Sequence, residues 1–332
     1  MRIAVLTARS TFELRDVPMP VLAPDEVLVK VAMCGVCASE LEQWDGDGAA
    51  DYPLYLGHEV SGTVVDAGPN ASGVAVGDPV GVWVTSRGFS EYVAVKAEYC
   101  RPAGDVPLDL ALAEPLACAV NAVDLADVRL GDDVVLIGAG FMGNLVHELV
   151  ALRGVRSLVV ADTRTDALEK ASELGATRVV RVPAESLPDV VAEVTEGRGA
   201  DVTFECTGTQ GGLAGVGDVT RMSGKVVLVG YHQGKPREIP LGYWNWMAFQ
   251  IVNGHFREVA TIMRGMTMGM RLLTSGAVST APLVTHRFPL HRIGDAFSAA
   301  RNKPDGFVKA VVVVGDEDDS GTPGGARRTP AG

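Results

Sequence analysis

The stretch VVLIGAGFMGNL, residues 134–145, decides how this chain folds. It begins with an apolar run typical of a buried strand, and three glycines spaced G-x-G-x-x-G lead into the apolar stripe of a helix. Such a turn lets the backbone approach a pyrophosphate, which the free N–H groups at the helix N-terminus bind. The stretch therefore predicts a dinucleotide site. Its predicted cofactor-binding residues are Gly138, Gly140, Phe141, Met142 and Gly143.

An acidic residue stands where the next predicted strand ends. That strand is SLVVAD, residues 157–162, and Asp162 follows Gly143 by 19 residues. A carboxylate at this place accepts hydrogen bonds from the ribose hydroxyls and repels a 2′-phosphate, so NAD is favoured over NADP. Arg164 lies two residues further on and leaves accommodation of a phosphate open. A helix N-cap or a turn is the alternative role for Asp162.

Strands and helices alternate through the middle of the chain. ADVTFECTG (200–208) and GKVVLVG (224–230) are further predicted strands, so we expect an α/β fold with a Rossmann-type, doubly wound parallel sheet. Thr207 and Gly230, where these strands end, complete the predicted cofactor site. The predicted divisions are a β-rich catalytic domain at 1–118, the Rossmann domain at 119–255, a return to the catalytic domain at 256–315, and a disordered tail at 316–332.

Composition excludes several classes of protein. The chain has 332 residues, enough for two domains, and its formal charge of −12 makes a nucleic acid or an anionic membrane surface an unsuitable partner. No run has the length and apolarity of a membrane helix or a signal peptide, and an odd number of scattered cysteines fits a reducing cytoplasm. His147 falls opposite the apolar stripe of its helix, so we expect it to face solvent.

Two cysteines near the N-terminus have the spacing C-x-x-C. By itself this spacing of Cys34 and Cys37 permits a redox dithiol, half of a structural zinc site, or one ligand of a catalytic metal. His58 and Glu59 stand side by side further on, and thiolate, imidazole and carboxylate are all good zinc ligands. Taken singly, each of these residues is more typical of core packing or a turn than of a metal site.

Several spaced motifs give the chain a family resemblance. GVCASE (35–40), GHE (57–59) and EPL (114–116) stand where zinc-dependent medium-chain dehydrogenases/reductases have G-x-C-x-[ST]-[DE], G-H-E and E-P-L. FECTG, GHFRE and PLVTHRFPL resemble the sorbitol (polyol) dehydrogenases of that family. The resemblance covers roughly residues 1–314. It implies that the β-rich part is a GroES-like catalytic domain and that the protein forms a homodimer or homotetramer.

The resemblance also implies a site. A catalytic zinc would be held by Cys37, His58, Glu59 and Glu114, the two carboxylates serving as ligand or water-holding base. Ser39 would take the alcohol proton toward the nicotinamide ribose, and Arg257 of GHFRE would bind substrate hydroxyls. Many members carry a structural zinc on four closely spaced cysteines. This chain has no cysteine between 37 and 100, so one zinc per chain is expected.

Two positions depart from the family pattern. Glu42 stands where many members have a histidine that completes the proton relay, and Gln43 stands where the sorbitol enzymes have a tyrosine. A relay through Glu42 and one through water and Glu114 both stay open. Trp44 and Tyr52 are candidate pocket walls, although an aromatic residue there is equally typical of the core.

The leading hypothesis is a zinc- and NAD-dependent dehydrogenase that oxidises a secondary alcohol of a polyol, sugar or cyclitol to a ketone. The first alternative is a zinc-free, NADPH-dependent enone or quinone reductase of the same fold, which the Cys/His/Glu set and Asp162 disfavour. The second is a non-enzymatic NAD-binding protein, which would bind NAD tightly without turning over any alcohol.

Overall fold

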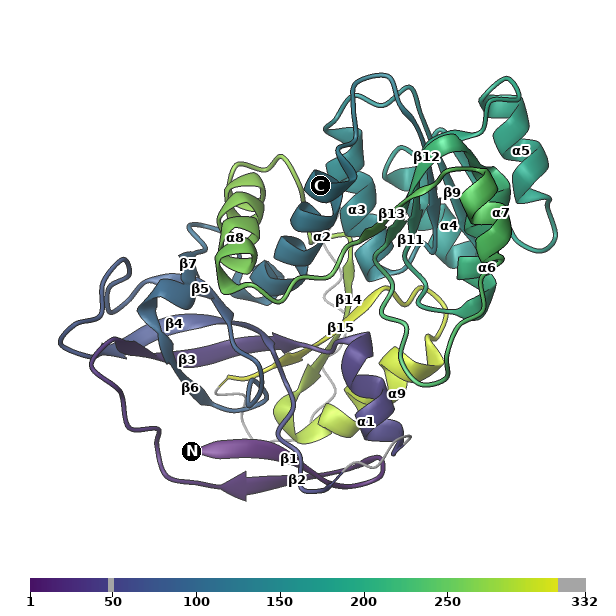
Figure 1. The fold of residues 1–332 in the computed structure, drawn as a ribbon. Helices are drawn as coiled ribbons and strands as arrows, with labels where there is room; N and C mark the ends of the chain where they lie inside the picture. The colour runs from purple at the N-terminus through teal and green to yellow at the C-terminus, as the bar shows by residue number, and fades with distance from the viewer. Residues whose placement is uncertain (47–50, 316–332) are drawn as a thin grey trace, which may run out of the picture.

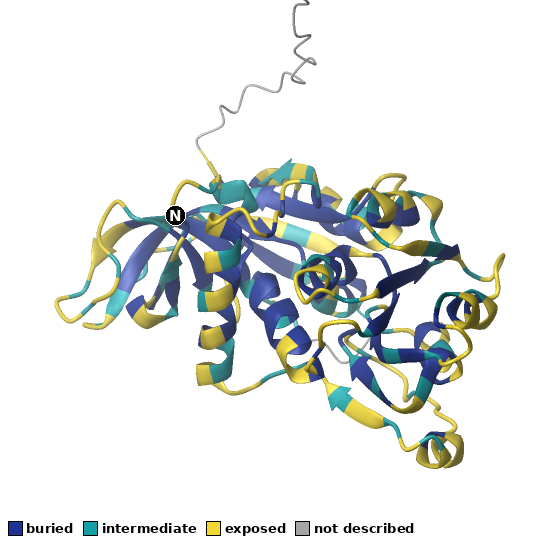
Figure 2. Ribbon diagram, turned by 90° about the horizontal axis from the view of Figure 1, so that it is seen from above, coloured by how far each residue is buried: buried dark blue, intermediate teal, exposed yellow. Residues whose placement is uncertain are grey.

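The computed structural model describes residues 1–46 and 51–315; the predicted tail, 316–332, lies outside them. Figure 1 shows a β-rich part beside an α/β part, with two long helices between them. These two helices are α2 (Ala113–Ala126) and α8 (Val259–Thr274). They pack against each other, and α2 touches strands of both sheets. The two parts therefore share one continuous buried core (Figure 2).

The α/β part is built on a six-stranded sheet. Its strands are β8 (Asp133–Ile137), β9 (Ser157–Asp162), β10 (Arg178–Arg181), β11 (Ala200–Glu205), β12 (Thr220–Leu228) and β13 (Gln250–Asn253). All neighbours are parallel, in the order β10-β9-β8-β11-β12-β13. This order arises when right-handed crossovers wind to both sides of the first strand, and it confirms the predicted doubly wound sheet. The helices of this part are α3 (Phe141–Ala151), α4 (Thr165–Glu173), α5 (Leu187–Val194), α6 (Gln210–Val219) and α7 (Leu241–Trp246).

The β-rich part is a mostly antiparallel sheet of seven strands. They are β3 (Glu26–Gly35), β4 (Glu59–Ala67), β5 (Pro79–Trp83), β6 (Tyr92–Lys96), β7 (Cys100–Pro102), β14 (Val284–Pro289) and β15 (Lys309–Val313). Strand β15 pairs with β3, so the C-terminal strands return to the sheet that the N-terminal half begins. This return places residues near 309 beside residues near 36.

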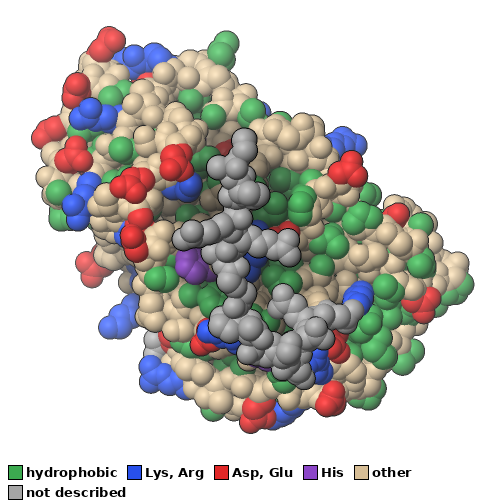
Figure 3. Space-filling model, turned by 180° about the vertical axis from the view of Figure 1, so that it is seen from behind, with side chains coloured by type: hydrophobic (Ala, Val, Ile, Leu, Met, Phe, Trp, Pro, Cys, Tyr) green, Lys and Arg blue, Asp and Glu red, His purple; other side chains and the backbone are tan. Residues whose placement is uncertain are grey.

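Shorter elements complete this part. They are the hairpin β1 (Arg2–Ala8) and β2 (Thr11–Asp16), the helices α1 (Leu41–Asp45) and α9 (Ile293–Asn302), and the 3-10 turns η1 (Ala38–Glu40), η2 (Ala97–Tyr99), η3 (Leu108–Leu110) and η4 (Leu290–Arg292). On the face shown in Figure 3, the described acidic and basic side chains are interspersed rather than gathered by sign. No helix within the described residues is both long and apolar enough to span a membrane.

One sequence prediction about this fold is wrong. His147 was expected to face solvent, but its side chain is 1% exposed, and neither ring nitrogen has a hydrogen-bond partner among the described residues. The reason is that α3 is covered on two sides, by the parallel sheet and by α2, so it has no fully exposed polar face. Burial lowers the pKa of His147 to about 4, so the ring is neutral.

Candidate metal and cofactor site

The pairing of β3 with β4 brings Cys37 and His58 together. Gly35, the last residue of β3, is opposite Glu59, the first residue of β4, in an antiparallel register. Cys37 follows the end of one strand and His58 precedes the start of the other, so the two side chains meet. Ligand atoms of Cys37, His58 and Glu59 lie within 4.8 Å of one another, the one such group of three found in the described part of the chain. Thiolate, imidazole and carboxylate together fit zinc.

Glu40 fixes the orientation of His58. Its Oε1 accepts a hydrogen bond from the backbone N of Gly57 at 2.7 Å and from Nδ1 of His58 at 3.0 Å. With Nδ1 bound to a carboxylate, Nε2 is left for a metal. Burial alone would lower the pKa of His58, but its hydrogen bonds with Cys37 and Glu40 outweigh burial and raise that pKa to about 12. Cys37 and Glu40 thus place two groups that can carry a negative charge beside this ring.

Glu59 lies buried beside these groups and is paired with Lys309 of β15. The Nζ of Lys309 lies 2.7 Å from Oε1 and 2.6 Å from Oε2, and it donates to the carbonyl of Val36 at 2.9 Å. A Cβ on Gly35 would lie 2.0 Å from Glu59 Oε2, so only glycine leaves room for this carboxylate. Burial lowers the pKa of Lys309, but the charges of Glu59, Cys37 and Glu114 and the hydrogen bond with Glu59 together outweigh burial and raise it. The ammonium therefore stays charged.

Glu114 lies in the first turn of α2. Burial raises its pKa, and the nearby charge of His58 partly offsets this effect. Cys118, one helical turn on, donates its thiol to Glu114 Oε1 at 3.5 Å. Glu114 is not part of the compact group of Cys37, His58 and Glu59. Its role as a zinc ligand or base stays a prediction.

A pocket of about 370 Å³ opens beside Ser39 and His58. The Oγ of Ser39 donates to the Sγ of Cys37 at 3.1 Å, and Nε2 of Gln233, which follows β12, donates to the carbonyl of Ser39 at 2.8 Å. The pocket therefore has walls from both sheets. Its lining residues are Ser39, Glu40, Gln43, Leu54, Tyr55, Leu56, His58, Thr85, Ser86, Tyr231 and Gln233.

Of the other residues that the sequence singled out, only some line this pocket. Gln43 is among its lining residues, whereas Arg257 is not: it is exposed, and its Nη1 donates to the carbonyl of Phe256. The ring of Trp44 packs against the core, 6.1 Å from that of Phe297. Tyr52 also packs against the core and donates its hydroxyl to the Gln43 carbonyl at 3.0 Å.

Cys34 is a core residue. Its side chain is 0% exposed, and burial raises its pKa well above the ordinary range. A buried thiol held in its protonated form is a poor nucleophile, which argues against a redox pair of Cys34 and Cys37. Residues 84–91, between β5 and β6, contain no cysteine.

The glycine-rich turn after β8 has the shape that a pyrophosphate requires. Gly138 has φ +105°, and a Cβ there would lie 2.7 Å from Cγ2 of Thr207. A Cβ on Gly143 would lie 1.9 Å from the carbonyl oxygen of Gly138, whereas one on Gly140 would meet nothing within 4 Å. Gly140 is also the N-cap of α3 and supplies no side-chain cap, so the first N–H groups are free for an anion.

The other predicted cofactor residues lie near this turn. Asp162 ends β9, and its two oxygens accept hydrogen bonds from the backbone N of Ala139 at 2.7 Å and of Arg164 at 2.9 Å. The ring of Phe141 lies under Nζ of Lys309, with 4.5 Å between nitrogen and ring centroid. Met142 packs partly buried against the core. The turn, the acidic residue and the metal group thus line one continuous region of the molecule.

Glu205 is a functional residue that sequence analysis missed. It ends β11 with 0% exposure, and its carboxylate accepts from the backbone N of Thr207 at 2.8 Å and of Gly208 at 3.1 Å, with Nε2 of His232 2.9 Å away. Its carbonyl accepts from the N of Gly230 at 2.8 Å. Glu205 therefore holds together the two loops that carry Thr207 and Gly230. The available signal was the acidic residue of FECTG at the end of an apolar strand.

Comparison with known proteins agrees with this geometry. Residues 23–105 match the alcohol dehydrogenase GroES-like domain and residues 142–266 match the zinc-binding dehydrogenase family. Sorbitol dehydrogenase of Gallus gallus is 30% identical over 90% of this chain and 93% of its own length, and that of Ovis aries is 31% identical over 87% and 90%. Galactitol-1-phosphate dehydrogenase from Escherichia coli, 24% identical, shares the fold with a TM-score of 0.85 over 94% of this chain and all of its own.

The chain therefore belongs to the zinc-dependent alcohol dehydrogenase family, and it is an oxidoreductase that acts on alcohols. The predicted combination of a Rossmann-type sheet with a GroES-like part is confirmed.

Proposed function

We propose that the protein is an NAD-linked dehydrogenase that holds one zinc ion per chain and oxidises a secondary alcohol of a polyol, sugar or cyclitol to a ketone. The group of Cys37, His58 and Glu59 beside a pocket rich in hydroxyl and amide side chains is the observation that carries this proposal. The similarity to sorbitol dehydrogenases supports the polyol class.

The residues around the pocket have separable tasks. Zinc held by Cys37, His58 and a carboxylate of Glu59 or Glu114 would polarise the alcohol oxygen, and NAD would accept the hydride. Ser39, whose Oγ lies 3.1 Å from the Cys37 sulfur, takes the proton from the alcohol oxygen. Glu42 or a water held by Glu114 then carries that proton to solvent.

The hydroxyl-rich lining supports a substrate with several hydroxyl groups. Thr85, Ser86 and Tyr55 line one wall and Tyr231 another, and each can donate and accept a hydrogen bond. Arg257 is proposed as a further donor to substrate hydroxyls although it is not among the lining residues; replacing it with alanine should then raise KM for the alcohol and leave zinc content unchanged.

NAD is proposed as the cofactor because Asp162 stands beside the glycine-rich turn. Its carboxylate is fixed by the backbone N of Ala139 and would accept the ribose hydroxyls. A 2′-phosphate at the same place would be repelled.

We propose a homodimer or homotetramer in the cytoplasm. Strand β13 is an edge strand of the parallel sheet, with Gln250 and Ile251 exposed, and an exposed apolar edge is suited to pairing with a second copy. All five cysteines are free thiols, which suits a reducing compartment. Sedimentation of an Ile251→Lys variant tests whether two copies of the chain pair through β13. The wild type should sediment as an oligomer and the variant as a monomer.

The function is tested by following NADH formation with a panel of polyols, sugars and cyclitols. We expect activity that a chelator abolishes and that added zinc restores. Reduction of enones or quinones by NADPH without zinc would overturn the proposal in favour of a reductase, and tight NAD binding without turnover of any alcohol would favour a non-enzymatic protein.

A further inference from the structure

Arg164 forms an ion pair with Asp166, next to Asp162. We call this pair, together with its contacts to the backbone of Gly306 and Phe307, the clamp. The Nε of Arg164 donates to Oδ1 of Asp166 at 3.0 Å and its Nη2 lies 2.5 Å from Oδ2, so the two side chains form a bidentate pair. Nη2 also donates to the backbone carbonyl of Phe307 at 2.7 Å. Most of the guanidinium's hydrogen-bonding edge is thus engaged, and its side chain is only 26% exposed.

The backbone of the β-rich part also binds Asp166. Oδ2 of Asp166 accepts a hydrogen bond from the backbone N of Gly306 at 2.8 Å. Gly306 and Phe307 precede β15 of the seven-stranded sheet, so the clamp joins the start of α4 to that sheet. The hydrogen bond from Arg164 lowers the pKa of Asp166, and the carboxylate is therefore charged near neutral pH. The two side chains of the pair are only 26% and 15% exposed.

This arrangement bears on the choice between the two dinucleotides. Recognition of a ribose 2′-phosphate needs a cation with free donors beside the end of the second strand, and Arg164 is the residue at that place. Its charge is neutralised by Asp166, and its Nε and Nη2 donors point to Asp166 and Phe307. A phosphate arriving there would meet a neutralised arginine and the carboxylates of Asp162 and Asp166.

We propose that Asp166 determines cofactor specificity by holding Arg164 away from the ribose 2′ position. The inference rests on the proposed NAD-linked function and adds a residue to it: Asp162 repels the 2′-phosphate, and Asp166 removes the cation that would attract it. Lys303 is a second cation near Asp162 and Arg164, so an experiment must separate the two.

The test is equilibrium binding of NADH and NADPH to the full chain, followed by tryptophan fluorescence. The wild type should bind NADH more tightly than NADPH. Asp166→Asn removes the bidentate ion pair and leaves the charge of Arg164 uncompensated, and we expect it to tighten NADPH binding by about tenfold, the value of one charge-assisted hydrogen bond, while NADH binding is unchanged. The double variant Asp166→Asn, Arg164→Ala should lose most of this gain, keeping only the part that comes from removing the Asp166 charge.

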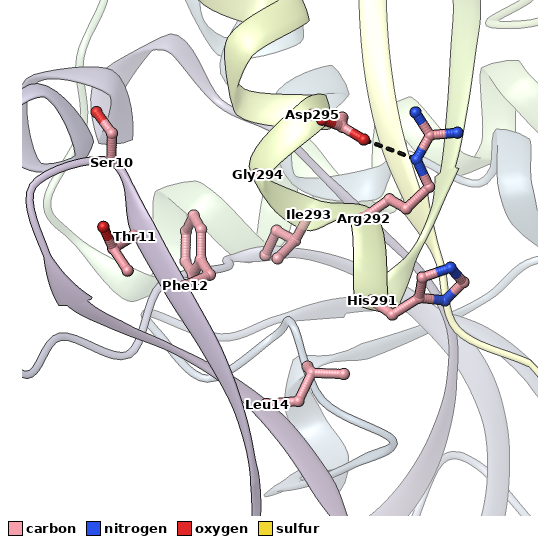
Figure 4. A pocket seen from close by; sticks show the side chains of 9 residues that line it. All are labelled: Ser10, Thr11, Phe12, Leu14, His291, Arg292, Ile293, Gly294 and Asp295. Atoms are coloured by element: carbon pink, nitrogen blue, oxygen red, sulfur yellow. Dashed lines mark hydrogen bonds and ion pairs between the residues drawn. The ribbon is translucent and has the colours of Figure 1, made fainter.

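A matched control is Asp295→Asn. Asp295, at the start of α9, accepts a hydrogen bond from Nε of Arg292 at 2.6 Å (Figure 4). Both residues line a surface pocket that shares no lining residue with the pocket beside Ser39 and His58. This variant removes the same kind of ion pair and should change neither dissociation constant.

Two results would overturn the proposed role of Asp166 in cofactor specificity. One is an Asp166→Asn protein that binds NADPH no better than the wild type. The other is a gain that survives undiminished in the double variant, which would assign it to Lys303 or to the lost charge of Asp166 and not to Arg164. If Asp166→Asn does not fold, Arg164→Ala tests the proposal by itself. If Asp166 holds Arg164 away from the ribose, Arg164→Ala should bind NADPH as the wild type does. If Arg164 is free to bind the phosphate, Arg164→Ala should bind NADPH more weakly. Failure of the wild type to bind either dinucleotide would contradict the proposed function instead.

Discussion

The ammonium of Lys309 lies 2.7 Å and 2.6 Å from the two carboxylate oxygens of Glu59, and both side chains are buried. The same nitrogen lies 4.5 Å from the ring centroid of Phe141 in the glycine-rich turn. One buried cation thus connects the proposed metal group with the proposed cofactor site. The Glu59 carboxylate can therefore pair either with Lys309 or with a metal, and the stability of variants with and without zinc distinguishes the two.

Replacing Lys309 with methionine should leave the Glu59 carboxylate buried and unpaired. We expect a loss of about 3–5 kcal/mol in the free energy of unfolding of metal-free protein. Zinc should restore part of that loss, because Glu59 can then turn to the metal. Urea unfolding with and without zinc measures both effects. The double variant Lys309→Met, Glu59→Gln is the control and should regain stability without metal; an equal loss with and without zinc would contradict this account of Glu59.

Glu40 is expected to act through His58. Glu40→Gln weakens the hydrogen bond that orients the imidazole, and comparable changes around metal-binding histidines lower metal affinity by about 10–100-fold. Competition with a chromogenic chelator measures the zinc dissociation constant directly. Glu42→Gln is the matched control, because Glu42 is a neighbouring carboxylate with no recorded contact to His58, and it should bind zinc normally. Equal zinc affinity of wild type and Glu40→Gln would refute the orienting role.

His147 predicts how stability depends on pH. Burial lowers its pKa in the folded protein from 6.5 to about 4, so between these values the unfolded chain binds a proton that the folded chain does not. Stability is complete above pH 6.5 and is lost as the pH falls toward 4, by about 3 kcal/mol from this residue. Metal-free His147→Leu should lose this part of the pH dependence, whereas exposed His291→Gln should keep it. Parallel curves for wild type and His147→Leu would contradict the assignment.

Gln233 joins the loop after β12 to Ser39. Gln233→Ala removes the 2.8 Å hydrogen bond to the Ser39 carbonyl, and we expect kcat/KM for the alcohol to fall about fivefold, as for one hydrogen bond. Zinc content should not change. Gln210→Ala is the control, since Gln210 binds the backbone of Glu238 at 2.8 Å and does not line the pocket. If both variants lose the same activity, the contact with Ser39 has no special role.

The parts that the sequence predicts depend on local pattern. The glycine-rich turn and Asp162 follow from spacing within one strand–helix–strand unit, and Cys37 and His58 follow from short motifs. The Glu59–Lys309 pair joins residues 250 positions apart, which no local pattern reveals. The available hint was a lysine inside the apolar run FVKAVVVV.

The burial of His147, which was predicted wrongly, and the positions of Trp44 and Tyr52, which the sequence left open, have a common physical origin. An amphipathic reading of α3 assumes one covered face, but α2 covers a second one and buries His147. Trp44 and Tyr52 pack against the core, and the pocket receives Tyr55 and Tyr231 instead. Both outcomes depend on how helices and loops pack across the two sheets, which a single strand or helix does not encode.

The measurement that tests the central claim most directly is metal content per chain, by mass spectrometry, for the wild type and for Cys37→Ser and Cys34→Ser variants purified without chelator. The account predicts one zinc in the wild type, one in Cys34→Ser and none in Cys37→Ser. Two zinc ions in the wild type, none even after zinc is added, or a full complement in Cys37→Ser would contradict it.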